Sequence, residues 1–350
     1  MSTLSLRGFD EDAPSDILRS LPQFHFLTSI KIEGGISVHT LQMLSLSKSR
    51  LRTLDICPVC PDGWNHDVTG EFGDGFSSVS SLRFRGNISD IAPLLHTIPL
   101  PSLDKLYVAP KKLYSLEILR DAAIDMSSTI AQQILRNVRL TLGLNVREVH
   151  LREIYEPLST FKHLITLSVT LTDARHRNPS INISDADLSS AINAWPHLEE
   201  FEVSEELDGD AHRRGDPSVA PTISGLVSVA RGWCALKVLG LPWFNTAGST
   251  LPTMIANGAI SGASHPLCKL RLKRLIGGAT QWSIMELALT LDALFPRLGV
   301  IGSEQMDRDV AQWRRELQDL DGKDSDSMSD IILMFVAAAR SGRTGDFDSI

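Results

Sequence analysis

Cysteine is scarce in this chain, and long apolar runs are missing. The 350 residues include 4 cysteines, too few for a disulfide framework in a chain of this length. The longest apolar run, Ile331 to Ala339, is about half of the roughly 20 residues that a membrane-spanning helix needs. The N-terminus lacks the basic and then apolar layout of a secretory signal. We therefore expect a soluble chain with reduced thiols, located in the cytoplasm or the nucleus.

An excess of positive charge is also missing. Lysine and arginine total 34 against 42 aspartates and glutamates, which gives a formal net charge of -8. This balance argues against nucleic acid or an anionic membrane as the main partner. With 43% hydrophobic and 22% charged residues, the chain has the composition of one large globular domain or two ordinary ones.

The common catalytic and cofactor motifs do not occur either. There is no glycine-rich dinucleotide or phosphate loop, no HExxH and no GxSxG. We therefore predict a protein that is not an enzyme, with no cofactor, no catalytic residue and no metal ligand.

One short segment, ICPVCPDGWNH, supports an alternative, a redox or zinc protein built on Cys57 and Cys60 with His66 nearby. Pro58 and Pro61 favour a loop, whereas a reactive pair of this spacing usually lies at a helix N-terminus. A structural zinc site needs four ligands, and no second pair of this kind follows. Ordinary loop thiols are the favoured interpretation.

An apolar pattern recurs along the chain. In NAWPHLEEFEV, residues 193 to 203, glutamates separate Leu198, Phe201 and Val203, as in a half-buried strand that follows a helix. The same spacing of three apolar residues occurs at Met1/Leu4/Leu6, Leu27/Ile30/Ile32, Leu51/Leu54/Ile56, Val79/Leu82/Phe84, Leu103/Leu106/Val108, Val146/Val149/Leu151, Leu164/Leu167/Val169, Leu236/Leu239/Leu241 and Leu267/Leu270/Leu272, with a decayed copy at Leu298/Ile301/Ser303. Segments with helical spacing lie between them, at 37–46, 89–96, 185–194, 223–231 and 284–294. The copies recur about every 30 residues.

A strand and a helix of this size cannot bury their apolar faces alone, so the copies are expected to stack. The pattern predicts an α/β fold, a leucine-rich-repeat solenoid with a parallel concave sheet and outer helices over residues 1–305. A C-terminal capping helix is expected at 306–320, where Val310, Trp313, Leu317 and Leu320 have helical spacing. Residues 321–350 are expected to form an acidic linker, a short apolar helix and a flexible tail.

Two segments, ISDADLSSAINAWPHLEEFEV and TISGLVSVARGWCALKVLGLPW, resemble the degenerate leucine-rich region of F-box proteins of basidiomycete fungi. The resemblance implies a target-recognition module of a ubiquitin ligase, in which an F-box binds the Skp adaptor of a cullin complex. Ala13 to Leu21 is similar to the opening of an F-box, but the strand pattern at Leu27 leaves no room for its remaining helices. Skp and cullin are therefore expected as partners only if an F-box is supplied elsewhere, and truncation of a longer F-box protein stays an open alternative.

The polar residues between the inward apolar residues should form the exposed face of the sheet. The candidate partner-binding residues on this face are Arg83, Arg85, Lys105, Tyr107, His150, Arg152, Glu200, Glu202, Lys269, Arg271 and Lys273, with Lys31 and Glu33 before them. They form two basic zones around an acidic one, and Arg83, Arg85, Lys105 and Tyr107 are predicted to make one contiguous exposed patch. Arginine and tyrosine are frequent interface anchors, so we expect an unidentified protein target. The alternatives are RNA or phosphoprotein recognition by the basic zone, or charges that only keep the face hydrated.

The N-terminal copy predicts one further contact. Met1, Leu4 and Leu6 would form an edge strand without a covering helix, and such edges pair with other chains. We expect self-association through this N-terminal repeat.

Overall fold

The computed structural model describes residues 2–7, 26–36, 38–46, 50–58, 72, 76–98, 100–110, 113–130, 135–144, 146, 148–172, 180–206, 217–246, 265–276, 281–298, 332 and 336. They belong to two compact units, unit 1 (Met1–Pro179) and unit 2 (Ser180–Ile350). Both units consist of parallel strands and helices, so the predicted α/β class is confirmed.

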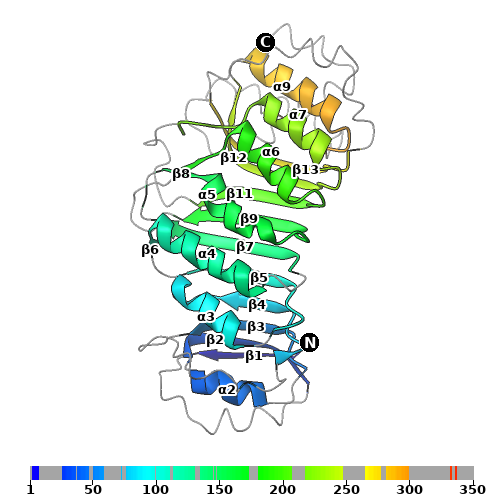
Figure 1. Cartoon of the computed structure of the whole chain (residues 1–350). Coiled ribbons are helices and arrows are strands. Elements are labelled where there is room, and N and C mark those ends of the chain that lie inside the picture. Colours follow the sequence, from blue (N-terminus) through cyan, green and yellow to red (C-terminus); the bar gives the residue numbers. More distant parts are fainter. Residues whose placement is uncertain are drawn as a thin grey trace. The chain divides into compact units, whose positions relative to one another are not determined.

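Unit 1 contains a parallel sheet whose strands follow one another in chain order (Figure 1). The order is β1 (Ser2–Arg7), β2 (Leu27–Ile36), β3 (Thr53–Pro58), β4 (Ser81–Phe84), β5 (Lys105–Val108), β7 (Asn137–Leu144) and β9 (Thr166–Thr172), with β6 (Leu113–Tyr114) also paired to β7. Every one of these strands except β6 and β7 coincides with a predicted copy of the apolar pattern.

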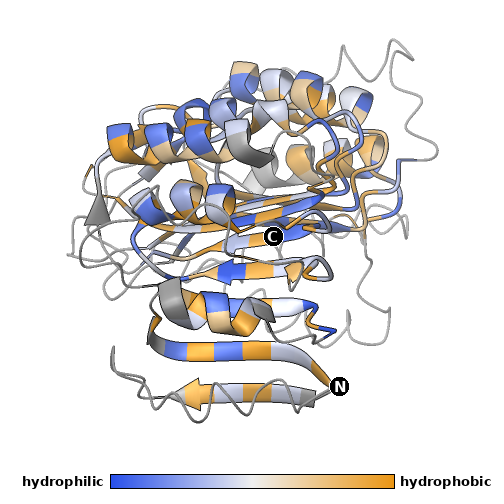
Figure 2. Cartoon of the chain, turned by 60° about the horizontal axis from the view of Figure 1, so that its bottom comes forward, coloured by the Kyte–Doolittle hydropathy of each residue, from blue (hydrophilic) through white to orange (hydrophobic). Residues whose placement is uncertain are grey.

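The strands of unit 1 are paired in the register that the apolar pattern requires. The middle apolar residues lie opposite one another across consecutive strands, and all are buried: Ile30, Leu54, Leu82, Leu106, Val138 and Leu167. Figure 2 shows hydrophobic and hydrophilic residues alternating along the strands, which follows from the two-residue period of side chains in a strand.

One predicted copy was wrong. Val146/Val149/Leu151 does not form a strand of this sheet: β8 covers only Glu148–His150, and Leu151 begins a helix. The sheet position after β5 is filled by β7, whose Leu135, Val138 and Leu140 have the same spacing and are buried.

The helices of unit 1 are α2 (Val38–Leu46), η4 (Ile88–Asp90), α3 (Ile91–Thr97), α4 (Leu116–Ile130), α5 (Leu151–Tyr155) and η5 (Glu156–Thr160). α3, α4 and α5 lie side by side over one face of the strands β4 to β9 (Figure 1). They cover the face that carries Leu82, Phe84 and Leu106, so the residues that alternate with these three point away from the helices.

Unit 2 repeats the arrangement with β10 (Ser180–Asn182), α6 (Asp185–Ala194), β11 (Glu200–Glu206), α7 (Ile223–Gly232), β12 (Val238–Asn245), β13 (Lys269–Ile276) and α9 (Gln281–Leu294). Phe201 of β11 lies opposite Leu239 of β12, which lies opposite Leu270 of β13. The predicted burial is confirmed for Leu198, Phe201, Val203, Leu236, Leu239 and Leu241, each at most 1% exposed.

A buried residue three positions before the first apolar residue extends the pattern in both units. Its carbonyl accepts a hydrogen bond from the N–H of that first apolar residue, at 2.9 to 3.3 Å. The residues at this position are Phe76, Leu100 and Phe161 in unit 1 and Trp195, Trp233 and Phe295 in unit 2. In these six copies the buried side chain therefore anchors the turn before the first apolar residue.

A second set of backbone hydrogen bonds joins each copy of the pattern to the next. In unit 1 the carbonyl of Arg52 accepts hydrogen bonds from the backbone N–H groups of Ser80 and Ser81, and the carbonyl of Ser80 accepts from those of Asp104 and Lys105. The carbonyl of Asp104 accepts from the N–H groups of Arg136 and Asn137, and the carbonyl of Arg136 accepts from those of Ile165 and Thr166. In unit 2 the carbonyls of Glu199 and Lys237 do the same. We call this series of bonds the carbonyl ladder.

The predicted capping helix at 306–320, with Trp313, and the acidic linker lie outside the described residues. Within the apolar segment that follows, Ile332 and Val336 are helical and buried. In the described part of the chain, no helix combines the length and the apolar character needed to cross a membrane.

Candidate functional site

The exposed face of the unit 1 sheet carries a row of side chains that crosses six strands. Consecutive members lie opposite one another in neighbouring strands: Lys31, Asp55, Arg83, Tyr107, Arg139 and Ser168. Two residues earlier in each strand, a parallel row contains Ser29, Thr53, Ser81, Lys105, Asn137 and Thr166. Neighbouring strands are about 4.8 Å apart, so side chains in the same row are close enough to interact.

The middle of this face holds a basic cluster, which we define as Arg83, Lys105, Tyr107 and Arg139. Arg83, Lys105 and Arg139 are exposed and Tyr107 is half-buried. The guanidinium carbon of Arg139 lies 5.7 Å from the centre of the Tyr107 ring, which is a cation–π distance. Among the described residues, neither Arg83 nor Lys105 forms an ion pair or a side-chain hydrogen bond.

Arg85, predicted to belong to the same exposed patch, is instead engaged with Asp55. Its Nε donates to Asp55 Oδ1 at 2.9 Å, and its Nη2 lies 2.8 Å from the same oxygen. The two side chains are 24% and 10% exposed, respectively. Arg83, Arg85, Lys105 and Tyr107 do share one face, but Arg85 is not available there as a free cation. Lys31 is likewise paired, with Glu33 of its own strand.

The sheet does not include His150 or Arg152, contrary to the register predicted for them. His150 is the last residue of β8, and its backbone N–H donates to Glu153 Oε2 at 3.0 Å. Arg152 lies on α5, where its Nη2 is 3.3 Å from Glu156 Oε1. The error has a physical cause: Val149, Leu151 and Ile154 are buried because a short helix follows a short strand, and apolar spacing alone does not distinguish this from a longer strand.

The charged residues predicted for the second half of the face belong to unit 2, where two of them pair with each other. Glu202 forms an ion pair with Arg271, although β12 runs between their strands. The residue opposite both is Gly240, and a Cβ atom there would lie 2.8 Å from Glu202 Cγ. The missing side chain leaves room for the pair to form across β12.

The remaining predicted residues of unit 2 differ in their surroundings. Lys273 donates to the carbonyl of Glu205 at 3.1 Å and is half-buried. Lys269 is exposed and Glu200 is half-buried. Because Glu202 and Arg271 neutralise each other, this face is less suited to a charged partner than the basic cluster of unit 1.

Of the residues in the redox or zinc alternative, the structure describes Cys57. This residue was expected in a loop but lies within β3. It is 6% exposed, and its thiol donates to the carbonyl of Arg85 at 3.3 Å. Cys60 and His66 lie outside the described residues. In the described ranges, no group of three or more histidine, cysteine or acidic side chains is arranged to hold a metal ion.

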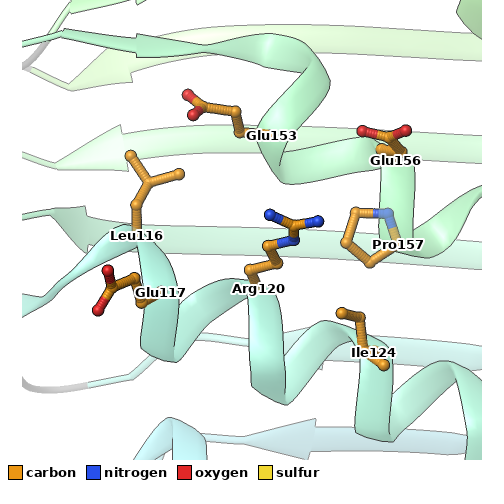
Figure 3. Close-up of a pocket in the computed structure, with 7 residues that line it drawn as sticks. All are labelled: Leu116, Glu117, Arg120, Ile124, Glu153, Glu156 and Pro157. Atoms are coloured by element: carbon orange, nitrogen blue, oxygen red, sulfur yellow. The ribbon is translucent and has the colours of Figure 1, made fainter.

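A pocket of about 310 Å³ lies on the helical side of unit 1, between α4 and the α5/η5 segment. Its lining consists of Leu116, Glu117, Arg120, Ile124, Glu153, Glu156 and Pro157, and Figure 3 shows Arg120 extending from α4 toward the α5/η5 segment. Glu153 and Glu156 already accept bonds from His150 and Arg152. Two of the four charged side chains that line the pocket are therefore already engaged.

The charged members of the sheet-face row that the sequence analysis missed are Asp55 and Arg139. Arg139 could have been found, because Leu135, Val138 and Leu140 match the apolar spacing and place residue 139 at the same position as Arg83 and Tyr107. Asp55 was identifiable in the same way from Leu54 and Ile56. Its pairing with Arg85 depends on side-chain conformations that the spacing does not encode.

The exposed sheet face of unit 1, with the basic cluster at its middle, is thus the candidate site. A comparison of the chain with models of protein families gives no match, and a comparison with the sequences of characterised proteins gives none either.

Proposed function

We propose that the chain is a leucine-rich-repeat solenoid that binds a protein partner through the exposed sheet face, without catalysing a reaction. The repeat interpretation is supported by the equal spacing of the apolar residues, by their common register, and by the carbonyl ladder. It is also supported by the buried anchoring residue that precedes six of the copies.

The observation that carries the binding proposal is the basic cluster. Arg83 and Lys105 stand on a sheet with a well-packed core beneath them, and in the described part of the chain neither has a carboxylate partner. Lys31 and Arg85, on the same face, are both paired. Cations beside a tyrosine are a favourable arrangement for an interface, because their backbones are already held in the sheet and neither Arg83 nor Lys105 has to break an ion pair before a partner binds.

The resemblance to F-box proteins suggests the biological setting: a target-recognition module related to ubiquitin-ligase receptors. The proposal predicts that the purified chain does not bind the Skp adaptor by itself. Mixing the two purified proteins and analysing them by size-exclusion chromatography tests this point, and a co-eluting complex would contradict it.

The binding proposal is tested by quantitative capture from the native cells with two matched variants. Arg83→Glu combined with Lys105→Glu reverses the charge of the site. Lys162→Glu combined with Arg231→Glu makes the same net change at exposed residues that do not belong to the unit 1 sheet. A specific partner should be retained by the wild-type chain and by the second variant, and lost by the first. Equal recovery of every captured protein by both variants would contradict the proposal.

A further inference from the structure

The carboxylate of Asp55 has three possible cationic partners around it. Lys31 and Arg83 lie opposite Asp55 in the two neighbouring strands, and Arg85 follows Arg83 two residues later. In the structure, two nitrogens of Arg85 bind this carboxylate, and Lys31 forms an ion pair with Glu33. Arg83 is therefore left without a carboxylate although one lies in the adjacent strand.

The cations of the basic cluster are spread out and do not converge on one point. Arg83 and Arg139 flank Tyr107 on either side, about 10 Å apart across three strands. Lys105 is two residues before Tyr107 in the same strand, which displaces it by about 7 Å along the sheet. Beyond Arg139 the row continues with the uncharged Ser168, and before Arg83 it meets the neutralised Asp55. This spacing suits separate single negative charges better than one concentrated dianion.

We infer that the basic cluster binds a short acidic segment of a protein partner, whose carboxylates pair with Arg83 and Lys105, and that Arg85 is a positioning residue that keeps Arg83 available by occupying Asp55. This inference rests on the proposed function and specifies the partner's chemistry.

The structure favours a protein segment over RNA at this site. Single-stranded nucleic acid is usually held by bases that stack on open aromatic rings. The aromatic residue of the cluster is Tyr107, and Arg139 already lies over its ring.

The partner chemistry is tested by fluorescence anisotropy with the full chain and four labelled probes. These are a peptide of alternating glutamate and serine, the same peptide with glutamine for glutamate, the glutamine peptide with one phosphoserine, and an oligouridine. We expect saturable binding of the glutamate peptide, at least about tenfold tighter than binding of the glutamine peptide. Arg83→Glu with Lys105→Glu should abolish this preference, while Lys162→Glu with Arg231→Glu should keep it. Tighter binding of the phosphoserine peptide or of oligouridine would overturn the assignment to carboxylates.

The role of Arg85 is tested with a pair of variants at the ion pair. Arg85→Met should weaken binding of the glutamate peptide several-fold, because Asp55 is then free to pair with Arg83. Adding Asp55→Asn to Arg85→Met should restore the wild-type affinity. If Arg85→Met leaves the affinity unchanged, or if the added Asp55→Asn restores nothing, Arg85 does not position Arg83.

The outcomes separate this inference from the proposed function. If the Arg83/Lys105 variant loses its captured partner but the glutamate peptide neither binds nor competes with that partner, the sheet face is still an interface and the acidic-segment inference is wrong. If both the partner and the peptide are lost by this variant alone, the inference holds.

Discussion

Phe201 has no exposed surface, and its ring lies against that of Trp233 with 4.9 Å between the ring centres. Replacement by alanine removes this contact and leaves a cavity beneath β11. We expect Phe201→Ala to lower the free energy of unfolding by about 3 to 5 kcal/mol in urea titrations. Phe26, which is 86% exposed, provides the matched control. A loss at Phe201 no greater than that of Phe26→Ala would contradict the packing described here.

His265 is held as a neutral ring in unit 2. The N–H of Leu267 donates to its Nδ1 at 3.2 Å, so its Nε2 carries the proton and donates to the carbonyl of Trp233 at 3.0 Å. The ring also contacts Phe295 edge-on. Burial lowers the pKa of His265 below the ordinary histidine value, against the smaller opposing effect of the bond to Trp233.

The lowered pKa of His265 has a consequence for stability. As the pH falls below about 6.5, the unfolded chain gains a proton at this residue that the folded chain does not take up. The free energy of unfolding should therefore decrease in acid. Urea titrations at about pH 7.5 and about pH 5.5 should show a smaller decrease for His265→Gln than for the wild type. The control is His197→Gln, at an exposed position. An identical pH dependence in the wild type and both variants would argue against this contribution.

At the residue level, the burial of side chains is easier to predict from the sequence than the pairing of charges. The alternation of apolar and polar residues correctly places Arg83, Lys105 and Tyr107 on one face, because side chains two residues apart in a strand point to the same side of the sheet. It does not reveal that Arg85 turns toward Asp55. That choice depends on competition among several cations for one carboxylate, which only the three-dimensional arrangement decides.

At the level of elements, the period of the apolar residues identifies most strands and helices. The predicted helix at 185–194 coincides with α6, since Ser184 caps it through the N–H of Asp187 and Trp195 ends it. Between Val108 and Leu164, the apolar spacing does not identify the elements correctly. There the chain inserts α4, β8 and α5, and the buried residues of a strand followed by a short helix imitate the pattern of one strand.

Two glycines allow the close approach of α6 and α7. A Cβ atom at Gly225 would lie 2.4 Å from Asp185 Oδ1, and one at Gly232 would lie 2.2 Å from Ile192 Cγ2. Asp185 is further constrained, because its carboxylate accepts bonds from the backbone N–H and the hydroxyl of Thr222 at the start of α7. The contact between these helices thus leaves no space for an added methyl group.

Alanine normally stabilises a helix relative to glycine. We expect the opposite here: Gly225→Ala and Gly232→Ala should each lower the free energy of unfolding by about 1 to 3 kcal/mol, because the two helices must separate. Ser224→Ala, at an exposed position of the same helix, should have little effect. Urea titration of the three variants measures the difference, and stabilisation by either glycine replacement would mean that the helices are less closely packed.

At the level of the whole molecule, β1 is the terminal strand in the order described for unit 1, and Leu4 and Leu6 on it are partly exposed. Such an edge can pair with the same edge of another copy. We expect the measured mass in light scattering to rise with protein concentration, and lysines introduced at Leu4 and Leu6 to prevent the rise. Circular dichroism of the variant controls for unfolding. A constant monomer mass for the wild type at high concentration would contradict the prediction.

The carbonyl ladder has a consequence for how unit 1 opens. Each carbonyl bonds only to the next copy, so the coupling between copies is between nearest neighbours, as in a one-dimensional chain of linked sites. Opening should then begin as fraying at β1, the terminal strand, and advance from there along the ladder. In native-state hydrogen exchange, the amides of β5 and β7 should exchange more slowly than those of β1. The surface that carries the basic cluster would then stay ordered after β1 has opened.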